Sequence, residues 1–278
     1  MTQPQETTLR AHDGLLLHGV RWRAETPLKA CVLLVHGIGE HSGRYDHVAR
    51  FLAERGYTVY SLDYRGHGKS EGVRADVGSF DLPAKDVKTG YDWLRAEEGV
   101  CPVYILGHSQ GTLVTLLFVL THPEAVVGVI LSATMLGLAH MSPPLLLLAN
   151  VLNAVAPRWK VIPLDSSTLS RDPEVLRASA NDPLNHNKPL TPHIIHEMIY
   201  ESRRVLKCLP SLTASILIMH GTGDRLVPPS GSQLVYDTVG SPDKTLKWYD
   251  GLYHEICNEP EQGQVLDDIA AWLDRQRA

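Results

Sequence analysis

VYILGHSQG, residues 103–111, is the stretch that decides the fold of this chain. Its first half is apolar and has the length of a buried strand, and residues 110–121 after it are apolar on almost every side, as in a buried helix. Between them lies the pattern Gly-x-Ser-x-Gly. A sharp strand-to-helix turn presents a serine hydroxyl at the carboxyl edge of a sheet, and glycines two residues on either side let strand and helix approach closely. Ser109 is therefore the predicted nucleophile.

Strands and helices alternate around this stretch. Apolar runs of strand length are found at residues 30–35, 57–62, 103–106, 127–132, 216–219 and 245–249. Helical patterns are found at residues 45–55, 82–98, 110–121, 230–235 (opened by a capping box of Ser230 and Gln233) and 265–273. A hairpin about Asp13-Gly14 precedes them. Such alternation predicts an α/β fold with a mostly parallel central sheet and helices on both faces.

The alternation stops in a proline-punctuated, helical segment. We expect residues 136–207 to form an inserted helical cap, and residues 1–135 and 208–278 to form the core. Within the cap, residues 145–156 are very apolar. Such a helix is usually packed into a core, but in a cap it can instead expose its apolar face to lipid and line an acyl channel, with Leu148 and Leu152 as contacts. The sequence leaves both alternatives open.

A serine hydroxyl is a poor nucleophile at neutral pH and needs a base, which is in turn oriented by an acid. In folds of this kind the acid and then the histidine follow the serine, each after a later strand. Asp224 comes directly after the strand that ends near Met219, and His254 follows the last strand. We therefore predict a catalytic triad of Ser109, Asp224 and His254.

The residues after the first buried strand are suited to stabilising a negative charge on the substrate. HGIG, residues 36–39, follows that strand, so backbone N–H groups can point toward the serine. We predict an oxyanion hole made by the backbone N–H groups of Ile38 and Gln110, the residue after the nucleophile. The charged, glycine-rich residues 63–70 end the second buried strand, and we expect them to build a turn and a structural ion pair.

Composition excludes several other classes of protein. The chain has 278 residues, with 44% apolar and 21% charged residues, which are values typical of a globular protein. Its 26 basic and 31 acidic side chains give a net charge of −5, so no nucleic-acid partner is expected. Ser42 stands where a dinucleotide-binding fingerprint needs its third glycine, and neither ordering of the zinc-protease motif is present. We expect no cofactor and no metal, and four reduced cysteines.

The sequence also bears on location. The N-terminal residues lack the basic and apolar regions of a signal peptide, and the longest apolar stretch, residues 145–156, is too short to cross a bilayer. These features predict a cytoplasmic protein that makes at most transient contact with a lipid surface through its cap. The oligomeric state is not predicted by any feature of the sequence.

Five motifs together resemble monoacylglycerol lipases of the α/β-hydrolase fold. They are HGIGEHSGRY at 36–45, DYRGHGKS at 63–70, GHSQG at 107–111, HGTGD at 220–224 and YHE at 253–255. The resemblance runs over nearly the whole chain, and residues 170–184 of the cap are similar to the bacterial members. It implies a serine hydrolase that releases one fatty acid from a glycerol ester without a metal or cofactor.

The resemblance implies further site residues and one departure. Glu40 and Arg44 would belong to the polar end of the pocket. Gln110 and Thr112 stand where the family usually has methionine and glycine, which affects the expected range of lipid ester substrates rather than the reaction. A broad carboxylesterase or a lysophospholipase with the same triad is the alternative, and a non-catalytic binding protein on this fold is a third.

Overall fold

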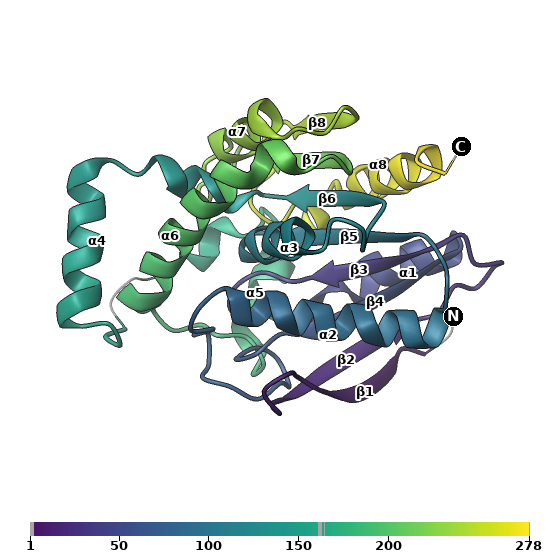
Figure 1. Cartoon of the computed structure of the whole chain (residues 1–278), viewed down its shortest axis with the longest axis horizontal. Coiled ribbons are helices and arrows are strands. Elements are labelled where there is room, and N and C mark those ends of the chain that lie inside the picture. The colour runs from purple at the N-terminus through teal and green to yellow at the C-terminus, as the bar shows by residue number, and fades with distance from the viewer. Residues whose placement is uncertain (1–2, 161–162, 164, 278) are drawn as a thin grey trace.

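The structure of the protein is a computed structural model that describes residues 3–160, 163 and 165–277. In these residues eight strands form one sheet in the order β1-β2-β4-β3-β5-β6-β7-β8 (Figure 1). The strands are β1 (Gln5–Arg10), β2 (Leu16–Trp22), β3 (Ala30–Val35), β4 (Tyr57–Asp63), β5 (Val103–His108), β6 (Gly128–Ser132), β7 (Ser215–Gly221) and β8 (Lys244–Tyr249). Strand β2 runs antiparallel to β1 and β4, and the pairs from β4 onward are parallel. The predicted hairpin and mostly parallel sheet are confirmed.

Helices cover both faces of the sheet, as the alternation predicts (Figure 1). The core helices are α1 (Asp46–Glu54), α2 (Asp81–Glu98), α3 (Gln110–Thr121), α7 (Ser230–Thr238) and α8 (Gln262–Arg275). Buried residues of α2, α3 and α7 pack in one apolar cluster, and those of α1 and α8 pack in a second cluster on the opposite face. Strands β3, β4 and β5 are buried along their whole length because both of their faces are covered.

The junction of β5 and α3 is the most closely packed part of the core. Residues 110–119 of α3 are all buried, which agrees with their apolar composition. A Cβ atom at Gly111 would lie 2.3 Å from the carbonyl oxygen of Val35, so only glycine lets α3 pass this close to β3. The helix therefore begins directly beneath the carboxyl ends of the central strands.

The segment between β6 and β7 holds the elements of the predicted cap. These are the helices α4 (Pro143–Val155), α5 (Pro173–Asn181) and α6 (Pro192–Cys208), and the short 3-10 helices η2 (Met135–His140) and η3 (Ser166–Thr168). Helix α6 packs against α3 and η2, and its Ile194, Met198 and Val205 join the larger apolar cluster. Helix α4 packs against α6 and stands away from the sheet (Figure 1). The boundaries 136 and 207 of a separate cap stay a prediction.

Helices α4 and α7 bear on two expectations from the sequence, the surroundings of the apolar cap helix and the predicted capping box. No residue of α4 is buried, and its Leu147 is 64% exposed, so the alternative of a helix packed into the core is wrong. The capping box is also wrong: Pro229 precedes the first turn of α7, and the Gln233 side chain donates a hydrogen bond to Asp237 instead of capping. In the described residues no helix is long and apolar enough to span a bilayer.

Candidate active site

Ser109 lies at the sharp turn between β5 and α3. Its backbone has φ 52° and ψ −122°, a conformation that residues with a side chain rarely adopt. Its backbone N–H donates to the Ser132 carbonyl oxygen at 2.9 Å, which ties the turn to β6. The turn places the Ser109 hydroxyl at the carboxyl edge of the sheet, where it lines a cavity.

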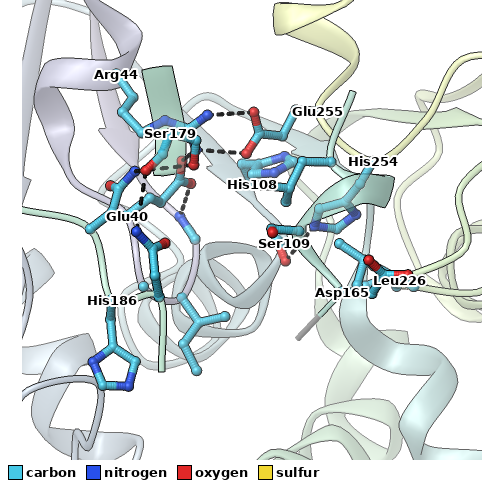
Figure 2. Close-up of a pocket in the computed structure, with 18 of the residues that line it drawn as sticks. Glu40, Arg44, His108, Ser109, Asp165, Ser179, His186, Leu226, His254 and Glu255 are labelled. Carbon is cyan, nitrogen blue, oxygen red and sulfur yellow. Dashed lines mark hydrogen bonds and ion pairs between the residues drawn. The ribbon is translucent and has the colours of Figure 1, made fainter. Parts of the chain in front are cut away.

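The structure brings the other two predicted residues to this hydroxyl. The Nε2 atom of His254 lies 2.9 Å from Ser109 Oγ, and its Nδ1 atom lies 2.7 Å from Asp224 Oδ2. Figure 2 shows the His254 ring turned toward Ser109. The acid loop after β7 and the histidine loop after β8 are joined by the hydrogen bond from Gly223 N to the Leu252 carbonyl oxygen, at 2.9 Å. The three side chains therefore form one hydrogen-bonded chain.

Asp224 is buried but remains anionic because hydrogen bonds compensate for its burial. Burial alone raises the pKa of a carboxyl group, but hydrogen bonds from His220 and His254 outweigh this effect and hold the pKa of Asp224 well below its usual value. Its Oδ1 atom accepts from the backbone N–H groups of Leu226 and Val227, at 2.8 and 2.9 Å. Asp224 can therefore accept a hydrogen bond from the Nδ1–H group of His254.

The two imidazoles next to Ser109 have opposite pKa shifts. Burial lowers the pKa of His254, but the hydrogen bond and charge of Asp224 raise it by more, and the resulting pKa is above the usual value. Burial and the neighbouring His254 lower the pKa of His108 to about 4. Of these two rings, His254 is thus the one suited to take up a proton from Ser109 near neutral pH.

Two backbone segments flank Ser109, the loop after β3 and the start of α3. Gly37 is adjacent to Ser109, since a Cβ atom on Gly37 would lie 3.1 Å from Ser109 Cβ. Neither Ile38 N–H nor Gln110 N–H donates to any residue that the structure describes. Gln110 is also the first residue of α3, whose N-terminal dipole favours negative charge. The oxyanion hole made by these two N–H groups stays a prediction.

A buried cluster of charges lies on the side of the cavity opposite Asp165 and Leu226 (Figure 2). The Arg44 guanidinium donates to Glu255 at 2.6 and 2.7 Å and to Glu40 at 3.0 Å. Burial opposes ionisation of Glu40, but the charge of Arg44 outweighs it and lowers the pKa of Glu40 to about 2. Glu40, Arg44 and Glu255 all line the cavity, so their charges are available to a polar part of a ligand.

The cavity has a volume of about 250 Å³ and lies between the sheet edge and the cap. Core residues Ile38, Met135, Leu226 and Val227 give it an apolar side. The cap contributes Asp165, Ser166, Leu169, Ser179 and residues 185–189. The structure does not bring Leu148 or Leu152 to this cavity, because both lie on the outlying helix α4.

The two departures from the usual elbow motif point away from the cavity. The Tyr64 hydroxyl lies 2.8 Å from the Gln110 side-chain oxygen and 2.9 Å from the Gly37 carbonyl oxygen. The Thr112 hydroxyl donates to the Ser109 carbonyl oxygen at 2.6 Å. Neither side chain lines the cavity, so both support the backbone of the turn rather than shape the acyl pocket.

Sequence reasoning missed three residues of the site: Glu255, His108 and His220. Glu255 follows His254, but its partner Arg44 is 211 residues away, and no spacing reveals such a pair. His108 is the last residue of β5 and His220 is the last but one of β7, and a histidine at the carboxyl end of a buried strand is a usable signal. The expected ion pair near residues 63–70 is confirmed, with Arg65 at 2.7 Å from Asp86.

Known proteins agree with this fold. Residues 26–261 match the family described as serine aminopeptidase, S33. The chain is 39% identical to a monoacylglycerol lipase of Mycolicibacterium smegmatis, over 96% of this chain and 98% of the relative, and 34% identical to a human monoglyceride lipase, over 96% and 89%. The crystal structure of the Paleococcus ferrophilus monoacylglycerol lipase superposes with a TM-score of 0.81 at 31% identity, over 94% of this chain and 99% of that one. The chain therefore belongs to the serine aminopeptidase S33 family of α/β hydrolases, and it is a serine ester hydrolase.

Proposed function

We propose that the enzyme hydrolyses monoacylglycerols to a fatty acid and glycerol, with Ser109, His254 and Asp224 as its triad. The observation that carries the proposal is the chain of hydrogen bonds from Ser109 through His254 to Asp224, at 2.9 and 2.7 Å, with Ser109 and His254 lining the cavity. The names of the relatives support the glycerol ester as substrate.

In the first half of the reaction, Ser109 Oγ attacks the ester carbonyl carbon while His254 Nε2 takes the hydroxyl proton. The carbonyl oxygen becomes an oxyanion that accepts hydrogen bonds from the backbone N–H groups of Ile38 and Gln110. The bond between the carbonyl carbon and the glycerol oxygen then breaks. His254 passes its proton to that oxygen, and glycerol leaves.

In the second half, water replaces glycerol. His254 Nε2 takes a proton from the water while its oxygen attacks the acyl carbon of the acyl-enzyme. The bond to Ser109 Oγ breaks, the serine regains its proton from His254, and the fatty acid leaves. Asp224 remains ionised throughout and stabilises the imidazolium that forms in each half.

The two sides of the cavity support an ester with a polar alcohol and an apolar acid. Glu40, Arg44 and Glu255 offer both hydrogen-bond donors and acceptors, as the hydroxyl groups of glycerol require. Met135 and Leu226 are apolar and suit methylene groups, whose burial contributes about 0.8 kcal/mol each.

The exposed helix α4 supports a transient contact with a lipid surface. Its Leu145, Leu147, Leu148, Val151 and Val155 are 48–73% exposed. Apolar patches of this kind on a solvent-exposed face are typical of interaction sites, and the helix has no charged residue. We propose that this face touches the monoacylglycerol-bearing surface while the substrate enters the cavity.

A substrate panel tests the proposal. Purified enzyme should hydrolyse monoacylglycerols faster than diacylglycerols, triacylglycerols, lysophospholipids and short nitrophenyl esters. It should also react with a fluorophosphonate probe. Ser109→Ala should fold normally, lose the labelling and lose roughly a million-fold in kcat. Equal or faster turnover of lysophospholipid would replace the glycerol assignment with the lysophospholipase alternative, and no labelling of the wild type would favour a binding protein.

A further inference from the structure

A second imidazole contacts the carboxylate of Asp224. The Nε2 atom of His220 lies 3.0 Å from Asp224 Oδ2, the same oxygen that His254 Nδ1 contacts at 2.7 Å. His220 lies in β7, and its side chain has no exposed surface. It does not line the cavity, so any effect that it has on the reaction must be transmitted through Asp224.

The neighbours of His220 determine where its proton lies. Its Nε2 atom faces two acceptors, Asp224 Oδ2 at 3.0 Å and the Val227 carbonyl oxygen at 3.1 Å, so this nitrogen must carry a proton. Its Nδ1 atom lies 2.7 Å from the hydroxyl of Ser232, which is buried in the first turn of α7 and can donate to this nitrogen when the ring proton is on Nε2. The Ser232 hydroxyl thus favours the tautomer that points a proton at Asp224.

With His220 in place, each oxygen of Asp224 accepts two hydrogen bonds. Oδ1 accepts the backbone N–H groups of Leu226 and Val227, and Oδ2 accepts His254 and His220. Two donors on each oxygen fix both the plane and the rotation of the carboxylate. Without His220, Oδ2 would be held only by His254, the group that Asp224 is required to orient.

We infer that His220 is a positioning residue for the triad: its Nε2–H holds Asp224 so that Oδ2 faces His254, and Ser232 keeps His220 in the required tautomer. The inference rests on the proposed function of Ser109, Asp224 and His254. The low pKa of Asp224 agrees with it, since the hydrogen bond from His220 is the main cause that opposes burial. Outer hydrogen bonds orient the ligands of metal sites in the same way, and their loss typically costs about ten- to hundred-fold in activity.

Two amide substitutions separate this role from simple packing. A glutamine amide nitrogen reaches the position of Nε2, next to Asp224, whereas an asparagine amide nitrogen reaches only the position of Nδ1, next to Ser232. On a soluble short-chain ester, His220→Gln should keep kcat within about three-fold of the wild type. His220→Asn should lose about ten-fold or more in kcat, with KM changed by less than about two-fold in both.

Ser232→Ala and thermal unfolding complete the experiment. Ser232→Ala should lower kcat by about two- to five-fold at unchanged KM, because the tautomer is no longer fixed. Equal losses of kcat in His220→Gln and His220→Asn, or losses that follow only the unfolding temperature, would overturn the inference. If His220→Asn does not fold, an unchanged kcat in Ser232→Ala overturns it. A wild type that neither hydrolyses esters nor labels with fluorophosphonate would instead refute the proposed function itself.

Discussion

His254 is the residue through which pH controls the proposed reaction. Its Nε2 atom can accept the serine proton only when the ring is neutral, and Asp224 raises its pKa above the usual value of about 6.5. Protonation of the ring at low pH therefore blocks the attack by Ser109, and the block extends to a higher pH than for an ordinary histidine.

We predict an acidic limb in the pH profile of kcat/KM that lies above about pH 6.5. Asp224→Asn removes the anion that raises the pKa of His254, so it should move this limb to lower pH. It should also lower kcat by roughly ten-thousand-fold, because the amide favours the wrong tautomer. Steady-state kinetics of both proteins from pH 5 to pH 9 measure the shift, and an unmoved limb would assign it to another group.

Gln110 provides a second prediction at this scale. Its side chain is fully buried against Tyr64 and does not line the cavity. We expect Gln110→Met to leave the ratio of rates on medium-chain and long-chain monoacylglycerols unchanged, and to change the free energy of unfolding by no more than about 1.5 kcal/mol. Rate ratios and urea unfolding test this. A changed chain-length preference would show that the residue shapes the acyl pocket after all.

Among the elements, α3 and α4 differ most in how they are held. Helix α3 is buried between the strands and the cap, whereas α4 contacts the rest of the described chain mainly through α6. Both helices are apolar on nearly every side, and their composition alone does not tell them apart. Their tertiary surroundings decide that α3 positions Ser109 and that α4 presents leucines to solvent.

The contact between α3 and β3 predicts a large effect of a single methyl group. In Gly111→Ala the new Cβ atom would lie 2.3 Å from the Val35 carbonyl oxygen, and the backbone of both elements would have to move. We expect a loss of about 1–3 kcal/mol in the free energy of unfolding and a lower kcat. Gly263→Ala is the matched control, because that helical glycine has no atom within 4 Å of the new Cβ atom. Urea unfolding of the two variants should differ clearly, with the control as stable as the wild type.

Helix α4 predicts a difference between dispersed and dissolved substrates. Leu147→Glu places a charge on its exposed face, where Leu147 is 64% exposed, and should lower the rate on dispersed long-chain monoacylglycerol about ten-fold. The rate on a soluble short-chain ester should stay the same. Val100→Glu changes a residue that is 97% exposed, in the loop before β5 at the amino ends of the parallel strands, and should affect neither rate. Equal loss on both substrates would contradict a surface-contact role.

At the scale of the whole molecule, much of the fold and the convergence of Ser109, Asp224 and His254 were predictable from sequence. The carboxyl ends of parallel strands meet at one edge, so residues that follow different strands, such as Asp224 and His254, could be expected to converge. The pair of Arg44 with Glu255 and the exposure of Leu147 could not be predicted. Both depend on how segments far apart in the chain pack against one another and against the sheet, and local sequence patterns do not predict such packing.

Buried histidines make the whole fold sensitive to acid. Burial lowers the pKa of His36, brings that of His67 to about 3 and brings that of His108 to about 4, while each titrates near 6.5 in the unfolded chain. The unfolded state therefore binds more protons below about pH 6.5, and stability is lost as pH falls. His254 acts in the opposite direction, since its raised pKa contributes stability at low pH that is lost above its folded pKa.

We predict that the free energy of unfolding falls by a few kcal/mol between pH 7.5 and pH 5, at a rate of about 1.4 kcal/mol per pH unit for each proton taken up. His67→Asn keeps a donor for the Arg65 carbonyl oxygen but removes one titrating site, so it should reduce the slope by about one proton. Urea titrations at several pH values measure both slopes. A pH-independent wild type would mean that these rings are not buried as neutral groups.

The order of the segments along the chain has a consequence for biosynthesis. Ser109 precedes the cap, whereas Asp224 and His254 come after it, on the loops that follow the last two strands of the sheet. In a polypeptide emerging from the ribosome, the first five strands and the serine are made long before β7 and β8 are translated. On the proposed mechanism, a chain that ends before the loop after β8 lacks its catalytic base, and incomplete translation products are expected to hydrolyse no ester.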